Sequence, residues 1–172
     1  IIFQRWGKLA FDFLFSGHTT DVYGTNSDGT SMIEEGSPLL PRTPFAQSKL
    51  EAENALKKLC EQSSMSFVIL RLPLIYHIDA VNHFGQYISM VKSGRSLPLA
   101  NIKNQRTLLA LCNFESALSA VLHQPDLHNE TLIIADSIMI STTEMIDGIA
   151  VAATTPVKLF YVPKLLAKVS LS

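Results

Sequence analysis

Short apolar runs alternate with longer amphipathic stretches along most of the chain. Phe11–Ser16 and Phe67–Leu70 are short and apolar, which is typical of buried parallel strands. A polar loop rich in Gly, Ser and Pro covers Gly24–Pro41, and a helix is predicted after it, with Thr43 as N-cap and Pro44 as first helical residue. The apolar positions of this helix predict one buried face, made of Phe45, Ala52, Ala55, Leu56 and Leu59.

The same alternation continues toward the carboxyl end. Helices are predicted at Phe84–Val91, closed by Ser93-Gly94, at Phe114–Leu122, and at Met145–Ala152, opened by the capping-box spacing Ser141-Thr-Thr-Glu144. Further strands are predicted at Leu108–Leu111, Leu132–Ala135 and Val157–Val162, with a helix fragment after Pro163. Strands that alternate with helices need crossover connections, so the pattern predicts an α/β fold with a doubly wound parallel sheet of Rossmann type.

The chain contains no glycine-rich Gly-x-Gly-x-x-Gly run after a strand, and it opens with Ile1-Ile2-Phe3 rather than with methionine. We therefore expect a partial Rossmann-like fold whose glycine-rich amino-terminal half is missing. The strand at Phe11–Ser16 would then have a bare edge. We expect Ile1–Leu9, a second copy of the chain in a homodimer, or residues outside this chain to cover it.

Composition narrows the function classes. The 172 residues are 47% hydrophobic and 17% charged, with a net charge of −1 and no block of basic residues. These values exclude a disordered chain and make nucleic acid an unexpected partner. No apolar run is long enough to span a membrane, so we expect a soluble cytoplasmic protein. Cys60 and Cys112 are interpreted as small buried residues, and the five histidines lack the spacing of metal ligands, so no metal site is predicted.

Two motifs resemble the extended short-chain dehydrogenase/reductase family. Thr19-Thr-Asp-Val-Tyr-Gly24 follows the first predicted strand, and Pro44-Phe-Ala-Gln-Ser-Lys49 opens the first long helix. They resemble the family's Ser/Thr-x-x-Val-Tyr-Gly strand end and its Tyr-x-x-x-Lys pair. Arg71-Leu-Pro-Leu-Ile-Tyr76 and Asn101–Leu108 resemble two later family motifs in the expected order.

The resemblance implies an NAD-dependent nucleotide-sugar epimerase or dehydratase similar to UDP-glucose 4-epimerase, with residues 1–172 as the carboxy-terminal portion of one such domain. It assigns catalytic positions to Thr19, Phe45 and Lys49, and cofactor binding to Lys49 and Pro73. Arg106 stands where the family has an arginine that faces the diphosphate of a UDP-sugar, and His83 stands where an asparagine commonly contacts the nucleotide-sugar.

The chemistry of this pattern can be argued from the residues. Oxidation of a sugar hydroxyl needs a base at the departing proton, and a phenol can serve. A lysine four residues later on a helix shares its face and lowers the pKa of that phenol, while a threonine hydroxyl can bond the same substrate oxygen. Position 45, however, is phenylalanine, which has no ionisable proton. Tyr23 is an alternative base, although in the family this tyrosine belongs to a structural turn.

Other departures favour loss of activity, and several of the residues also have ordinary structural interpretations. His77, His83 and Cys112 stand where the family has glycine, asparagine and aspartate. Thr19 is also an ordinary strand-end residue and Lys49 an ordinary helix-surface residue. A solvated helix face is expected from the charged residues Lys49, Glu51, Glu53, Lys57 and Lys58. The methionines Met90, Met139 and Met145 are expected in the core. Two hypotheses follow: a catalytically impaired epimerase relative with weak or absent NAD binding, or a non-catalytic scaffold that binds a UDP-sugar or another subunit.

Overall fold

The computed structural model describes residues 13–24, 32–100, 102, 104–124 and 126–161, and gives the backbone alone for residues 13–18. The chain divides into two compact units. The first comprises Ile1–Pro73 with Leu109–Ala135, and the second comprises Leu74–Leu108 with Asp136–Ser172.

The first unit is built on a three-stranded parallel sheet. Its strands are β1 (Phe13–Thr19), β2 (Ser66–Leu72) and β5 (Glu130–Ile133), in the order β1-β2-β5. β2 is the central strand and pairs in parallel with both neighbours, Thr19 lying opposite Leu72 in the register with β1. Its apolar run Phe67–Leu70 is buried because both faces of the strand are covered.

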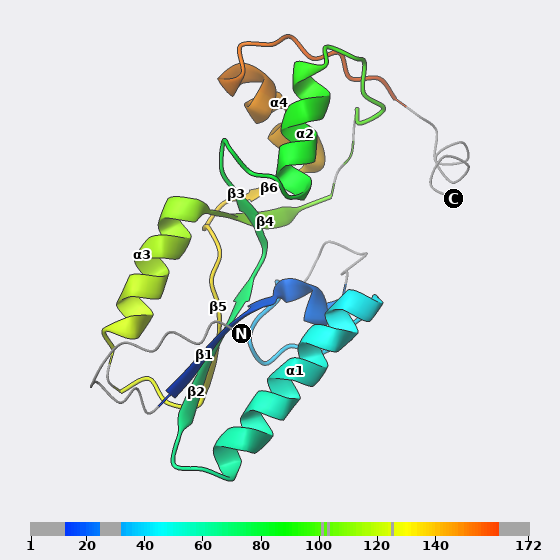
Figure 1. The fold of residues 1–172 in the computed structure, drawn as a ribbon. Helices are drawn as coiled ribbons and strands as arrows, with labels where there is room; N and C mark the ends of the chain where they lie inside the picture. Colours follow the sequence, from blue (N-terminus) through cyan, green and yellow to red (C-terminus); the bar gives the residue numbers. More distant parts are fainter. Residues whose placement is uncertain (1–12, 25–31, 101, 103, 125, 162–172) are drawn as a thin grey trace. The chain divides into compact units, whose positions relative to one another are not determined.

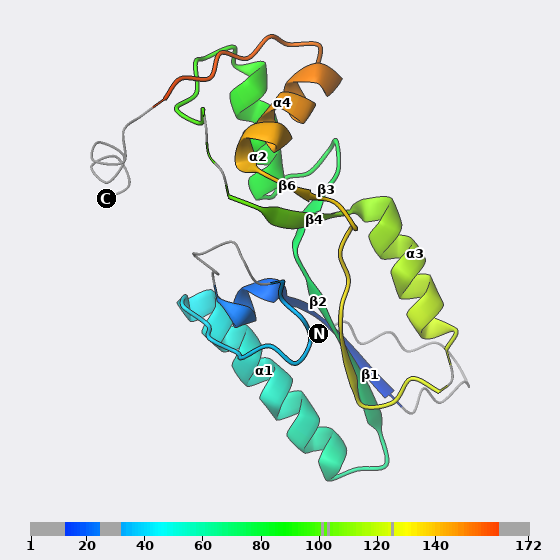
Figure 2. The ribbon, with the colours of Figure 1, turned by 180° about the vertical axis from the view of Figure 1, so that it is seen from behind.

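Helices cover both faces of this sheet. α1 (Pro44–Glu61) lies on one side and α3 (Leu111–Leu122) on the other, as both ribbon views show (Figures 1 and 2). Successive side chains of β2 alternate between the two: Phe67 and Ile69 cluster with Cys60 of α1, whereas Val68 and Leu70 cluster with Val121 of α3. A parallel sheet with helices on both faces confirms the predicted Rossmann-like α/β fold class.

A short 3-10 helix, η1 (Thr20–Tyr23), follows β1 and ends at Gly24. Gly24 has φ 77°, and a Cβ added there would lie 2.6 Å from the backbone oxygen of Leu40. Next to it, the Leu40 amide donates to the Val22 carbonyl at 2.9 Å. Glycine is therefore required at position 24 because the chain's own segment 32–42 passes directly over it.

The second unit contains a smaller sheet and two packed helices. Its strands are β3 (Leu74–Tyr76), β4 (Arg106–Ala110) and β6 (Met139–Ile140), in the order β3-β4-β6, with β4 and β6 antiparallel. Its helices are α2 (His83–Lys92) and α4 (Thr142–Ala152). They share one apolar cluster formed by Phe84, Ile88, Val91, Leu97, Leu108, Met145, Ile146, Ile149 and Ala150. The capping box predicted at Ser141 and Glu144 is present.

The predicted buried face of α1 is wrong. Phe45 is 57% exposed and Leu59 is 59% exposed, Ala52 and Ala55 are also exposed, and Leu56 is only partly buried. The residues that α1 buries are Ala46, Glu53 and Cys60. A buried glutamate stands at the centre of the true inner face, so a scan for apolar positions selects a neighbouring stripe instead.

Several smaller predictions also differ from the structure. Met90 and Met139 are exposed, and only Met145 of the three methionines is in the core. Residues 157–161 contain no strand of the sheets; they contact the chain through an isolated parallel bridge between Leu97 and Leu159. Within the described residues, no strand pairs with the outer edge of β1. Its expected cover, residues 1–9, and the helix expected after Pro163 lie outside the described residues.

Candidate functional site

The first candidate residue, Thr19, ends β1 and begins η1. Its hydroxyl accepts a hydrogen bond from the Asp21 amide at 3.2 Å and so caps the 3-10 helix. The side chain is half-buried, and η1 packs against α1. Thr19 therefore has the structural capping role that its sequence position allows. Its hydroxyl lies at the carboxyl end of β1, on the edge of the sheet where ligands of α/β folds bind.

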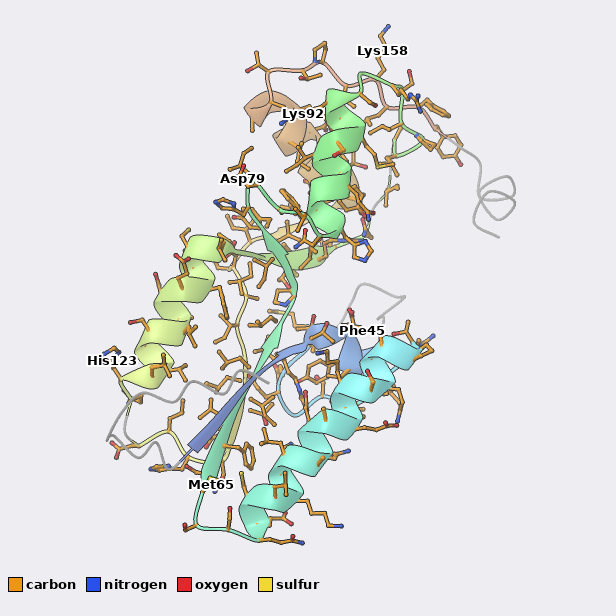
Figure 3. The ribbon with its side chains drawn as sticks, in the orientation of Figure 1. Phe45, Met65, Asp79, Lys92, His123 and Lys158 are labelled. Atoms are coloured by element: carbon orange, nitrogen blue, oxygen red, sulfur yellow. The ribbon has the colours of Figure 1, made fainter. Side chains whose placement is uncertain are left out.

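The first turns of α1 carry the other two candidate catalytic positions, Phe45 and Lys49. The Thr43 hydroxyl accepts from the Ala46 amide at 3.1 Å, and Pro44 is the first helical residue, so the helix start is fixed by its own sequence. Figure 3 shows Phe45 at this end of α1. The Lys49 ammonium lies 5.5 Å from the centroid of the Phe45 ring, which confirms that the two positions share a face. The ammonium faces a benzyl ring that has no proton to exchange.

Tyr23 does not offer a free phenol to this site. It is 4% exposed, and its hydroxyl donates to the Glu35 carbonyl at 3.2 Å while accepting from Nη1 of Arg71 at 2.5 Å. The Arg71 guanidinium also lies 4.8 Å from the centroid of the Tyr23 ring. These contacts hold Tyr23 in a structural network, and they count against the alternative that it replaces the missing base.

Glu53 and Arg71 form a buried ion pair that the sequence analysis missed. Arg71 donates from Nε and Nη2 to the two carboxylate oxygens of Glu53, at 3.1 and 2.6 Å, and the residues are 2% and 0% exposed. The prediction that Glu53 belongs to a solvated helix face is therefore wrong. Burial alone would lower the pKa of Arg71, but its hydrogen bonds to Glu53 and Tyr23, together with their electrostatic attraction, outweigh burial and raise the pKa.

A signal for this pair was present in the sequence. Arg71 directly continues the apolar run of β2, and by strand alternation it shares the face of Phe67 and Ile69, which packs on α1. A buried arginine on that face requires a carboxylate from the covering helix.

The remaining candidate positions are divided between the units. Pro73 is the last residue of its segment of the first unit, directly after β2. His83 is the exposed first residue of α2, after the N-cap Asn82, and Arg106 begins β4 half-buried, opposite Ile140. His83 and Arg106 belong to the second unit. Of the candidate residues, the structure brings Phe45 and Lys49 into contact.

The cysteines differ from each other. Cys60 is buried, and burial raises the pKa of its thiol. Cys112 is exposed in the first turn of α3, so its predicted burial is wrong. In the described part of the chain, no group of three or more metal-ligating side chains occurs, and no helix is long and apolar enough to cross a membrane.

The model of the NAD dependent epimerase/dehydratase family matches residues 5–135. The chain belongs to this family. The match covers both motifs discussed above and most of the first unit, including η1, α1 and the Glu53–Arg71 pair. The family assignment that Thr19–Gly24 and Pro44–Lys49 predicted is confirmed.

A curated member of the epimerase family is similar over much of the chain. UDP-glucose 4-epimerase from Vibrio cholerae is 30% identical over 117 residues, which is 67% of this chain and 36% of that protein. Two solved structures have a similar fold over most of this chain. The first is UDP-glucose 4-epimerase from Thermus thermophilus in complex with NAD, with a TM-score of 0.73 and 20% identity, covering 88% of this chain and 51% of that one. The second is UDP-N-acetylglucosamine 4-epimerase from Methanobrevibacter ruminantium in complex with UDP-N-acetylmuramic acid, with a TM-score of 0.71 and 17% identity, covering 94% of this chain and 57% of that one. The chain thus spans about half the length of these solved relatives.

Proposed function

We propose that this chain is a catalytically impaired relative of the nucleotide-sugar epimerases, and that residues 1–172 are the carboxy-terminal portion of one epimerase/dehydratase domain. The proposed ligand class is a UDP-sugar, because similar proteins are named for UDP-glucose and UDP-N-acetylglucosamine. The observation that carries the proposal is the pair at the start of α1. The Lys49 ammonium lies 5.5 Å from the ring centroid at position 45, and that ring belongs to phenylalanine.

Two roles of the acid-base site remain filled. The Thr19 hydroxyl can donate to a substrate oxygen, and the Lys49 ammonium can stabilise a neighbouring anion or bond a ribose hydroxyl. The proton of the sugar hydroxyl has no acceptor at position 45, and the Tyr23 hydroxyl is held by Arg71 and Glu35. A positioned acid-base group contributes about 10²- to 10⁴-fold in rate, and we expect this chain to lack that factor.

The residues of the chain fit one part of NAD and not another. Bound NAD would supply the hydride acceptor, and Lys49 suits its ribose hydroxyls. A pyrophosphate needs glycines that let the backbone approach it closely. The chain has no Gly-x-Gly-x-x-Gly run, and its own Leu40 and Ala80 carbonyls occupy the space beside Gly24 and Gly85. We therefore expect weak or undetectable NAD affinity for the 172-residue chain.

The test is C4 epimerisation of UDP-glucose with excess NAD, by this chain and by any longer form that its gene encodes. The parent should show no turnover, with no micromolar NAD binding by the 172-residue chain in calorimetry. In a form that binds NAD, Phe45→Tyr should raise the rate by about 10²-fold or more, because it restores the acid-base group. Phe45→Leu is the matched control, because it adds no hydroxyl, and it should show no turnover. Turnover by the parent that does not rise with Phe45→Tyr would contradict the proposal.

A second candidate function is a non-catalytic scaffold that retains nucleotide-sugar binding. Arg106 favours it, because the residue is half-buried and the donors of a guanidinium suit a diphosphate. This function predicts that UDP-sugar binds the parent and that Phe45→Tyr adds no turnover even with NAD bound. The homodimer expected from the open edge of β1 also stays a prediction, and sedimentation of the chain measures it.

A further inference from the structure

A polar network runs through the first unit from α1 to the sheet. Glu53 on α1 holds Arg71 on β2 through two hydrogen bonds, and Arg71 in turn holds the Tyr23 hydroxyl at the end of η1. The three side chains are nearly inaccessible to solvent, at 0%, 2% and 4% exposure. The network therefore joins a helix, a strand and the turn after β1 inside the molecule.

The network continues to the segment that crosses over Gly24. The Tyr23 hydroxyl donates to the Glu35 carbonyl, and the Glu35 carboxylate accepts from the Ile133 amide of β5 at 3.0 Å. In the sheet, Arg71 lies between His18 of β1 and Ile133 of β5. Arg71 is thus the point at which these segments of the first unit are tied together.

Buried ion pairs are poor stabilisers but good orienting devices. Removing two charges from water costs about as much as their attraction returns, so apolar residues of similar size often stabilise a core equally well. A two-pronged arginine–carboxylate contact, by contrast, fixes both distance and angle. The geometry of this pair is therefore better explained by orientation than by stability.

We propose that Arg71, through Glu53 and Tyr23, is the positioning residue that sets α1 and its Lys49 relative to η1 and Thr19. Glu53 lies one helical turn after Lys49 on α1, and Tyr23 is the last residue of η1, the 3-10 helix that Thr19 caps. Tilting α1 would move Lys49 away from the strand end, whereas the Thr43 cap and Pro44 fix only the helix itself. Functional groups of a site need placement to within about 0.5 Å, which a directional tether can supply.

The test separates position from stability. The double variant Glu53→Leu/Arg71→Met replaces the pair with apolar side chains, and we expect its melting temperature to equal or exceed that of the parent. A nitroxide attached at the exposed position of Gln47→Cys reports the distance from α1 to the η1 amides of Asp21, Val22 and Tyr23. Cys112→Ser removes the exposed thiol, and Cys60 is buried. We expect the relaxation enhancement at these amides to change by about 1.2-fold or more in the double variant, because it varies with the inverse sixth power of distance and placement to about 0.5 Å depends on the tether.

A matched control is Lys58→Met/Glu61→Leu, which removes one base and one acid from the exposed surface of the same helix and should leave the pattern unchanged. An unchanged pattern in a folded Glu53→Leu/Arg71→Met protein would overturn the proposal. If that variant does not fold, Tyr23→Phe removes only the hydroxyl, and an unchanged pattern there has the same consequence. The inference rests on the proposed function only in naming Thr19 and Lys49 as site residues. The measurement needs no ligand, so its failure is distinguishable from failure of the epimerase test.

Discussion

The first unit buries both of the buried charged side chains in the described part of the chain, Glu53 and Arg71, whereas the core of the second unit is one apolar cluster between α2 and α4. The first unit has two smaller apolar clusters, one on each face of its sheet. Apolar packing is non-directional and tolerates rearrangement, but a bidentate ion pair fixes one geometry. The comparison teaches that stability and placement are supplied by different residues in this protein.

The largest effect should come from breaking the ion pair on one side. Arg71→Met leaves the Glu53 carboxylate buried without its cation, which should lower the free energy of unfolding by about 4 kcal/mol. The double variant with Glu53→Leu should recover all of that loss and equal or exceed the parent in stability. Urea unfolding followed by circular dichroism measures both, with the exposed Arg95→Met as control. Equal losses in the single and double variants would contradict this account of the first unit.

A somewhat smaller loss is expected from the apolar core of the second unit. Ile146 on α4 is 0% exposed, and Ile146→Ala should lower the free energy of unfolding by about 3 kcal/mol through lost contacts and a cavity. Val151→Ala on the same helix is the control, because Val151 is 80% exposed and should change stability little. The loss at Ile146 should be the same at pH 5 and pH 8. A clear pH dependence would show that charged groups also hold this unit.

The smallest effect concerns pH and the segment held by Glu35. The hydrogen bond from the Ile133 amide is the main cause that lowers the pKa of Glu35 below its ordinary value of 4.5, and the charge of Arg71 contributes. Because the pKa of Glu35 is lower in the folded than in the unfolded protein, the contact contributes its full stabilisation of the fold at pH values above the ordinary pKa of 4.5. That stabilisation is lost as the pH falls through the folded-state pKa. Glu35→Ala at pH 7 removes the acceptor oxygen and should reduce protection of the Ile133 amide from hydrogen exchange by about fivefold, roughly one hydrogen bond.

Protection of the Ile146 amide serves as reference in the same exchange experiment, since it lies in the other unit. If Ile133 exchange is unaffected by Glu35→Ala, the Glu35 carboxylate does not fasten segment 32–42 to β5, and the network ends at the Glu35 backbone carbonyl.

The sequence was most informative where local rules decide the structure. The apolar run of β2 and the cap and proline at the start of α1 predict their elements because neighbouring residues determine them. β3 has three residues and β6 has two, too few to show the alternation of a strand, so the sequence pattern does not predict them.

The pattern of neighbouring apolar and polar residues does not predict the inner face of α1 or the partner of Glu53. Glu53 meets a partner 18 residues away, and a carboxylate is counted as a surface residue unless that partner is known. In the candidate site, the spacing of Phe45 and Lys49 correctly predicted a shared face, because four residues on a helix fix it. The burial of Tyr23 depends on Arg71 and could not be predicted from the turn alone.

The exposure of Phe45 has a genetic consequence. Its ring is more than half exposed and belongs to no buried apolar cluster, so a para hydroxyl could be added or removed without repacking the interior. Phenylalanine and tyrosine codons differ only at the middle base. A single point mutation could therefore add or remove a phenol at position 45, where we propose that the acid-base group is missing, with little change in folding.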